Sequence, residues 1–143
     1  NSRTRLFPGA ENYPSRTESL DVAISQIARS TGFSLAQVGQ AWKLLGTRAE
    51  AVLSKSTDRE SLPGTNVPVA LARHAIEHEW AAKLADLIER RLMLLYHQRL
   101  SRACVGRLAD LLVEGGKLLA DEARNSVSDE VARLAARFGK RVD

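Results

Sequence analysis

The sequence has few of the residues that crosslink small proteins or carry redox and metal chemistry. Among its 143 residues, Cys104 is the only cysteine, Met93 is the only methionine, and aromatic residues make up 5%. One cysteine excludes an internal disulfide and a cysteine pair for zinc. The apolar neighbours of Cys104 predict a core residue and not a nucleophile. No apolar run approaches the ~20 residues of a membrane span, and no signal-peptide pattern opens the chain.

The sequence also lacks the motifs of nucleotide-binding and catalytic proteins. Neither G-x-G-x-x-G nor a Walker A pattern is present, and no serine, cysteine or carboxylate catalytic set can be assembled. The net charge of +4 permits an anionic partner without requiring one. Because no initiator methionine opens the chain, we expect a piece of a larger protein. The sequence therefore predicts a helical module without catalytic, cofactor-binding or metal-binding residues of its own.

Helical periodicity predicts an all-α fold, a compact bundle of five to seven helices. No strand alternation is found, and apolar residues recur every three or four positions. Capping-box spacing predicts three helix starts, and glycines 32 and 46 predict the ends of the first two helices. Residues 57–67 are expected to be a loop. The capping pairs are Ser15 with Glu18, Ser34 with Gln37, and Thr47 with Glu50.

The apolar spacing from Val69 to Leu95 averages close to 3.6 residues, which predicts one long central helix or a collinear helix pair. Further helices are expected over residues 100–113 and from about residue 117 to residue 138, the latter interrupted near residues 124–130. We interpret residues 1–14 as an extended lead-in from a missing N-terminal domain. Residues 15–143 are predicted to form a single helical domain.

Two of the three histidines lie in the stretch RHAIEHEW, where His74, Glu77 and His78 match the H-x-x-E-H pattern of inverted zinc peptidases. A turn of about 100° per residue places both histidines roughly 160° from Ile76, away from the apolar stripe. A zinc hydrolase needs a third protein ligand, and His97 is too far along the chain to supply it. We expect exposed or interface histidines and no bound metal.

Two other segments have a functional alternative. Residues 34–53 have the order of a helix-turn-helix, but the first helix is about a turn too long and Glu50 would repel phosphate. We favour two packed helices and keep a stand-alone DNA-binding module as the alternative function. Arg133, Arg137 and Arg141 recur every four residues near the end of the chain. This face could lie on an anionic membrane, but we favour a solvated helix face.

The segment ALARHAIEHEWAAKLADLIERRLMLL, residues 70–95, resembles the C-terminal helical domain of FAD-dependent glycerol-3-phosphate dehydrogenases. That family has a glutamate, a bulky apolar residue and an alanine, followed by an aspartate and then by an adjacent arginine pair. The matching residues here are Glu79, Trp80, Ala81, Asp86, Arg90 and Arg91. Two further segments are similar to the family, LLGTRAEAVL at 44–53 and LFPGA at 6–10. The latter resembles the stretch that leads out of the FAD-binding part.

The resemblance implies an oxidoreductase of glycerol metabolism whose chemistry lies outside this chain. The full-length form would oxidise sn-glycerol 3-phosphate to dihydroxyacetone phosphate and reduce FAD. Electrons would pass to a membrane quinone or, in the oxidase branch, to oxygen. FAD and substrate would be bound by the missing N-terminal domain, the partner of this one. The resemblance thus implies that this domain alone is inactive and binds no nucleic acid. It also implies that the full-length protein is cytoplasmic and bound peripherally to the inner membrane. The electron acceptor and homo-oligomer formation stay open.

The charged residues of the motif predict a structural network. Asp86 precedes Arg90 by four residues, the order that the helix dipole favours. Arg91 has Leu87 one turn earlier, so its partner should lie on another helix or on the missing domain. We expect Glu79, Asp86, Arg90 and Arg91 to form a partly buried network that ties this helix to its neighbours or to the missing domain.

Overall fold

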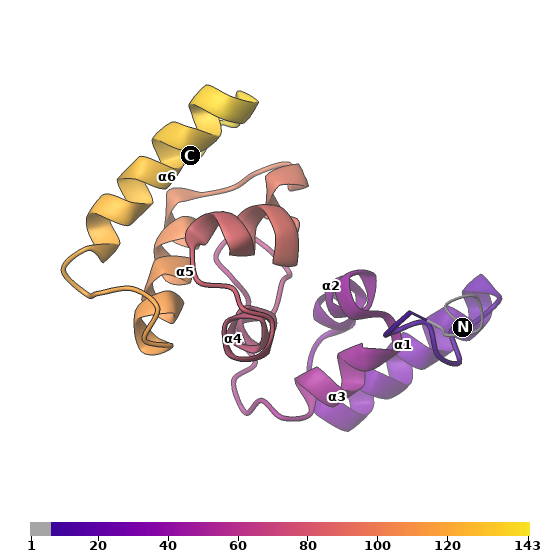
Figure 1. Ribbon diagram of the computed structural model, residues 1–143. Coiled ribbons are helices and arrows are strands. Elements are labelled where there is room, and N and C mark those ends of the chain that lie inside the picture. Colours follow the sequence, from indigo (N-terminus) through magenta and orange to yellow (C-terminus); the bar gives the residue numbers. More distant parts are fainter. Residues whose placement is uncertain (1–6) are drawn as a thin grey trace, which may run out of the picture.

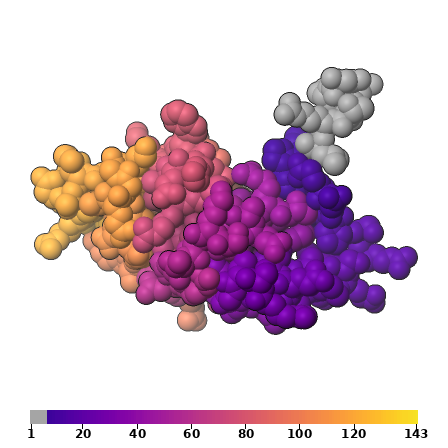
Figure 2. Space-filling model, turned by 90° about the horizontal axis from the view of Figure 1, so that it is seen from below, coloured from indigo at the N-terminus to yellow at the C-terminus, as the bar shows by residue number. Residues whose placement is uncertain are grey.

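Six α-helices make up most of the protein in the computed structural model, which describes residues 7–143 (Figure 1). Within that range there is no β-strand, only isolated bridges between Ser61 and Pro68 and between Leu100 and Val142. The predicted all-α class is therefore confirmed. The helices follow one another through space in chain order, from α1 at one end of the molecule to α6 at the other (Figure 2).

The first three helices are α1 (Thr17–Thr31), α2 (Leu35–Leu45) and the short α3 (Ala49–Leu53). Of the three predicted capping boxes, only the one at Ser34 and Gln37 forms, with both reciprocal hydrogen bonds present. The prediction at Ser15 is wrong because α1 begins one residue later, with Arg16 as its N-cap. The prediction at Thr47 is wrong because this residue lies inside the 3₁₀ turn η1 (Gly46–Arg48), whereas an N-cap needs an extended backbone.

The predicted extended lead-in is wrong where it can be compared. Its first six residues lie outside the described range, and residues 7–14 fold into turns. The N–H of Ala10 donates to the carbonyl of Phe7, and the N–H of Tyr13 donates to that of Ala10. The ring centroids of Tyr13 and Trp42 are 5.5 Å apart, so this segment packs against α2.

The predicted long helix over residues 69–95 is wrong, and so is the collinear pair. Helix α4 (Val69–His78) ends where Trp80 takes a left-handed backbone with φ of 60°, and it is followed by the π-helix η2 (Asp86–Arg91) and the 3₁₀ turn η3 (Leu94–Tyr96). In Figure 1 α4 is seen along its axis, whereas the helical segment that follows it lies across the view. The break lets Ala81 turn into the core, where it is 0% exposed. Apolar periodicity cannot reveal the break, because both segments turn their apolar residues toward one core.

The last two helices are α5 (Arg102–Glu114) and α6 (Ala123–Phe138), which pack side by side (Figure 1). The expected interruption near residues 124–130 is wrong: that stretch is helical, and residues 115–122 form the non-helical connection. The serine hydroxyl groups within residues 124–130 do not disrupt the backbone hydrogen bonds of the helix. The side chain of Ser128 donates to the carbonyl of Arg124 one turn earlier, which a helix accommodates.

One continuous cluster of buried apolar side chains extends from Ile27 in α1 to Leu134 in α6. Cys104 is 0% exposed within it, and burial raises the pKa of its thiol to about 11. The thiolate is therefore not populated near neutral pH, and the predicted core role of Cys104 is confirmed. None of the helices in residues 7–143 combines the length and hydrophobicity that a membrane span requires.

Candidate functional site

The residues of the predicted network lie on the surface segment that leads from α4 through η2. Glu79 is the C-cap of α4, and Arg91 is the last residue of η2. Asp86 opens η2, and Arg90 lies one turn further on. Because the chain turns at Trp80, Glu79 and Arg91, which a single helix would have kept apart, come together.

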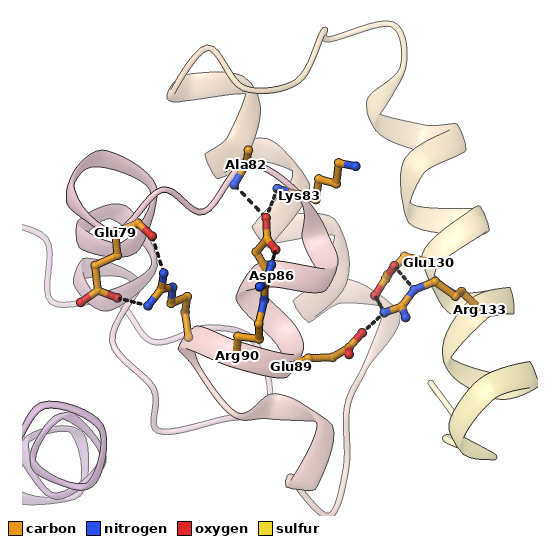
Figure 3. Close-up of polar contacts among 9 residues, drawn as sticks. Glu79, Ala82, Lys83, Asp86, Glu89, Arg90, Glu130 and Arg133 are labelled. Carbon is orange, nitrogen blue, oxygen red and sulfur yellow. Dashed lines mark hydrogen bonds and ion pairs between the residues drawn. The ribbon is translucent and has the colours of Figure 1, made fainter.

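Asp86 fixes the start of the second helical segment (Figure 3). One carboxylate oxygen, Oδ2, accepts hydrogen bonds from the backbone N–H groups of Ala82 and Lys83, each at 3.1 Å, and the other pairs with Arg90. The helical turn begins at Leu84, so the bond from Lys83 is one half of a capping box. Asp86 was the sequence signal for this helix start. It was missed because the apolar spacing continues through residues 69–95 and predicts a single helix there.

The acid and the base of this pair differ in exposure. The side chain of Asp86 is 15% exposed, whereas that of Arg90 is 74% exposed. Burial on its own would raise the pKa of Asp86, but the hydrogen bonds from Arg90 and from the N–H groups of Ala82 and Lys83 hold that pKa below its ordinary value. The carboxylate is therefore a structural anchor, and the guanidinium faces solvent.

Arg91 joins the two sides of the break at Trp80. Its Nη2 donates to the backbone carbonyl of Glu79 at 2.6 Å, and its Nη1 lies 3.6 Å from Glu79 Oε2. The expected partner on another helix is thus found at the end of α4, within this chain. The four motif residues form two separate pairs in the described part of the chain, with half-buried acids and more exposed arginines. A role toward a missing domain stays a prediction.

His74 also belongs to this cluster, which the sequence analysis missed. Its side chain is 14% exposed, and its Nε2 lies 3.7 Å from Glu79 Oε1 without a hydrogen-bond partner. Burial lowers the pKa of His74, Glu79 opposes that effect, and the positive charges of His78, Arg48 and Lys55 add to it. The prediction of an exposed position is wrong for His74, since its side chain is only 14% exposed, and an interface position stays a prediction. His78 is exposed as predicted, at 56%.

The two histidines line a pocket between α3 and α4. The rings of His74 and His78 have centroids 5.0 Å apart, and Lys55, Asp58 and Arg73 also line this pocket of about 350 Å³. Among residues 7–143, no group of three or more histidine, cysteine, aspartate or glutamate side chains is placed to hold a metal ion. Two imidazoles alone fall short of the three protein ligands of a catalytic zinc site.

A second ion-pair cluster ties α6 to η2 (Figure 3). Arg133 donates to both carboxylate oxygens of Glu130, at 2.8 and 2.6 Å, and pairs with Glu89 across the interface. Glu130 is only 7% exposed, and its hydrogen bonds together with those of Glu89 raise the pKa of Arg133. The prediction of a solvated arginine face is therefore wrong for Arg133. The spacing of residues 130 and 133 was visible in the sequence, whereas the contact with Glu89 depends on the fold.

The fold and this segment define a small all-α domain whose charged surface residues are organised by backbone contacts. The comparison with protein families places it further: a model of the C-terminal domain of alpha-glycerophosphate oxidase matches residues 2–125. The chain belongs to this family, and it is the C-terminal helical domain of an oxidoreductase of the glycerophosphate oxidase and dehydrogenase kind. The search of curated proteins and the search of solved structures each gave no match.

The structure gives no support to the DNA-binding alternative. Helix α3 would be the reading helix, but it has five residues and buries Ala49, Val52 and Leu53. A recognition helix needs a free face that enters the major groove. The helix-glycine-helix order in this chain is therefore a packing unit. Helix α6 lies mostly beyond the matched range.

Proposed function

We propose that this chain is the C-terminal helical domain of an FAD-dependent glycerol-3-phosphate dehydrogenase. Its full-length form would oxidise sn-glycerol 3-phosphate to dihydroxyacetone phosphate and pass the electrons to quinone. The observation that carries the proposal is the family match over residues 2–125. The motif from Glu79 to Arg91 adds support, because Asp86 pairs with Arg90 within one helical segment and Glu79 pairs with Arg91 across the turn at Trp80.

In this proposal FAD and substrate are bound by an N-terminal domain, and the present domain is inactive alone. Residues 1–14 would connect the two, and residues 15–143 would form one folded unit. The continuous core from α1 to α6 supports that division. Glu79, Asp86, Arg90 and Arg91 would shape the surface facing the rest of the enzyme. The full-length protein would be cytoplasmic and bind peripherally at the inner membrane, where its acceptor is found.

The test is to express the gene together with its upstream coding sequence. The purified protein should show a flavin spectrum and should reduce a dye only when glycerol 3-phosphate is added. Quinone as the acceptor predicts faster turnover with a soluble quinone than with oxygen, and little hydrogen peroxide. The isolated domain should show neither flavin nor dye reduction. A full-length protein without flavin, or a fragment with it, would contradict the proposal.

The proposal includes no metal in this domain. His74 and His78 offer only two imidazoles, and the shielded one has a lowered pKa because of burial and nearby positive charges. Metal analysis after dialysis against zinc should give less than one equivalent per chain. One tightly held zinc, lost in His78→Ala but retained in His97→Ala, would overturn this point.

A further inference from the structure

Trp80 combines two features that an isolated domain would not favour. Its side chain is 93% exposed, although tryptophan is the largest apolar residue in the chain. Its backbone is left-handed, with φ of 60°, a conformation that is a steric outlier for a bulky residue without a turn-forming side chain. A strained backbone persists only where its surroundings hold it in place. The exposed position of Trp80 therefore needs a structural cause.

That cause is found on both sides of the residue (Figure 3). Before Trp80, the guanidinium of Arg91 holds the carbonyl of Glu79 at 2.6 Å. After Trp80, the carboxylate of Asp86 holds the N–H groups of Ala82 and Lys83 at 3.1 Å. Ala81, its neighbour, is fixed in the core and donates its N–H to the carbonyl of Ala75. The turn is thus anchored on each side, and it presents the indole to solvent without a covering side chain.

The exposed charge around Trp80 is mainly positive, although one acid, Glu77, has a side chain that is 61% exposed. Asp86 and Glu79 have side chains that are 15% and 21% exposed, whereas those of Arg90 and Arg91 are 74% and 41% exposed. Lys83 is exposed as well. Tryptophan and arginine are the residues that most often dominate the energy of a protein interface. Two copies of this face would bring like charges together, so an isologous contact is disfavoured.

We propose that Trp80, together with Arg90 on η2, is the docking surface of this domain for the catalytic domain of its own polypeptide, in an apolar recess with an acidic rim. This inference rests on the proposed function and adds the contact residue. In Figure 2 residues 7–14, next to the proposed connection, and the segment after α4 project from the same edge of the molecule. A catalytic domain joined through the first residues can therefore reach this edge of the molecule, to which the segment after α4 belongs.

The first experiment is oxidative footprinting of the full-length protein, read by mass spectrometry at Trp80 and Leu119. Leu119 is a suitable reference, because it is 64% exposed and lies in the connection between α5 and α6. With rates corrected for the intrinsic reactivity of each residue type, Trp80 should be protected at least tenfold more than Leu119. The protection should persist over a hundredfold dilution. Equal reactivity would overturn the proposal, and protection lost on dilution would assign the surface to a second copy instead.

The second experiment compares Trp80→Ser with the matched variant Leu119→Ser in the same full-length protein. If Trp80 docks, its loss should speed proteolytic cleavage between the two domains at least fivefold, and Leu119→Ser should leave the wild-type rate. Equal rates in the two variants would overturn the proposal. Flavin content and glycerol 3-phosphate oxidation are measured on the same samples. A wild-type protein lacking both would contradict the proposed function, whereas a protected Trp80 in that protein would still support the docking surface.

Discussion

Gly9 and Gly46 meet backbone to backbone where the segment before α1 crosses the end of α2. The carbonyl of Gly9 accepts a hydrogen bond of 3.1 Å from the N–H of Thr47, and both glycines have positive φ, 89° and 58°. A Cβ on Gly46 would lie 2.1 Å from the carbonyl oxygen of Gly9. The two glycines belong to the two shorter segments of the family resemblance, so the fold joins motifs that are distant in the sequence.

This contact predicts that Gly46→Ala destabilises the domain. The new Cβ would clash with rigid backbone and occupy an unfavourable φ, so we expect the free energy of unfolding to fall by about 1–3 kcal/mol. Gly39→Ala in α2 is the matched control, because a Cβ there has no heavy atom within 4 Å. It should raise the free energy of unfolding by about 0.5–1 kcal/mol. Urea denaturation measures both changes, and an equal response of the two variants would rule out the close contact.

Helical class, core face and some helix ends, such as both ends of α2, can be read from this sequence because they depend on local chemistry. Ser34 and Gln37 cap α2 with neighbouring atoms only. Trp80 could not be predicted to end α4, since the turn depends on Ala81 reaching a core built by other helices. The pair of Glu79 with Arg91 depends on that same turn. Apolar periodicity indicates which residues face the core. It does not indicate whether two successive helical segments share the same helix axis.

The two residues of the Asp86–Arg90 pair should contribute unequally to stability. Arg90→Ala removes a largely exposed guanidinium and should cost about 0.3–0.5 kcal/mol, as exposed pairs do. Asp86→Ala removes the acceptor for two backbone N–H groups as well, and should cost about 1–2 kcal/mol, as for a lost helix cap. Thermal and urea unfolding of both variants give the comparison. A larger effect of Arg90→Ala would mean that the capping role of Asp86 is wrong.

Arg133 should matter more than its basic neighbours on α6. Arg133→Ala would leave Glu130, which is 7% exposed, without its hydrogen-bond donor. Because an uncompensated buried charge is costly, we expect a loss of about 2–3 kcal/mol, somewhat below the range for a fully buried pair. Arg137→Ala is the control, since its exposed side chain accompanies no buried acid. Equal urea midpoints for the two variants would reduce Arg133 to a surface charge.

His74 should make the domain less stable as the pH falls below neutral. Burial lowers the pKa of His74 from its ordinary value of 6.5 in the folded state, so the unfolded chain binds a proton more readily. Stability therefore rises with pH wherever the unfolded state holds the extra proton, and it falls as the pH decreases through 6.5. The side chains that face the imidazole are Glu79, which opposes this shift, and His78, Arg48 and Lys55, which reinforce it.

The measurement is the urea midpoint of unfolding at pH 7.5 and pH 5.5, for the wild type and for His74→Gln. The wild type should lose stability between these values, and His74→Gln should lose less of it, because glutamine does not titrate. His97→Gln is the control at a half-buried position outside the pocket between α3 and α4, and it should keep the pH dependence of the wild type. If His74→Gln and His97→Gln show the same slope as the wild type, the imidazole of His74 does not titrate differently in the folded chain.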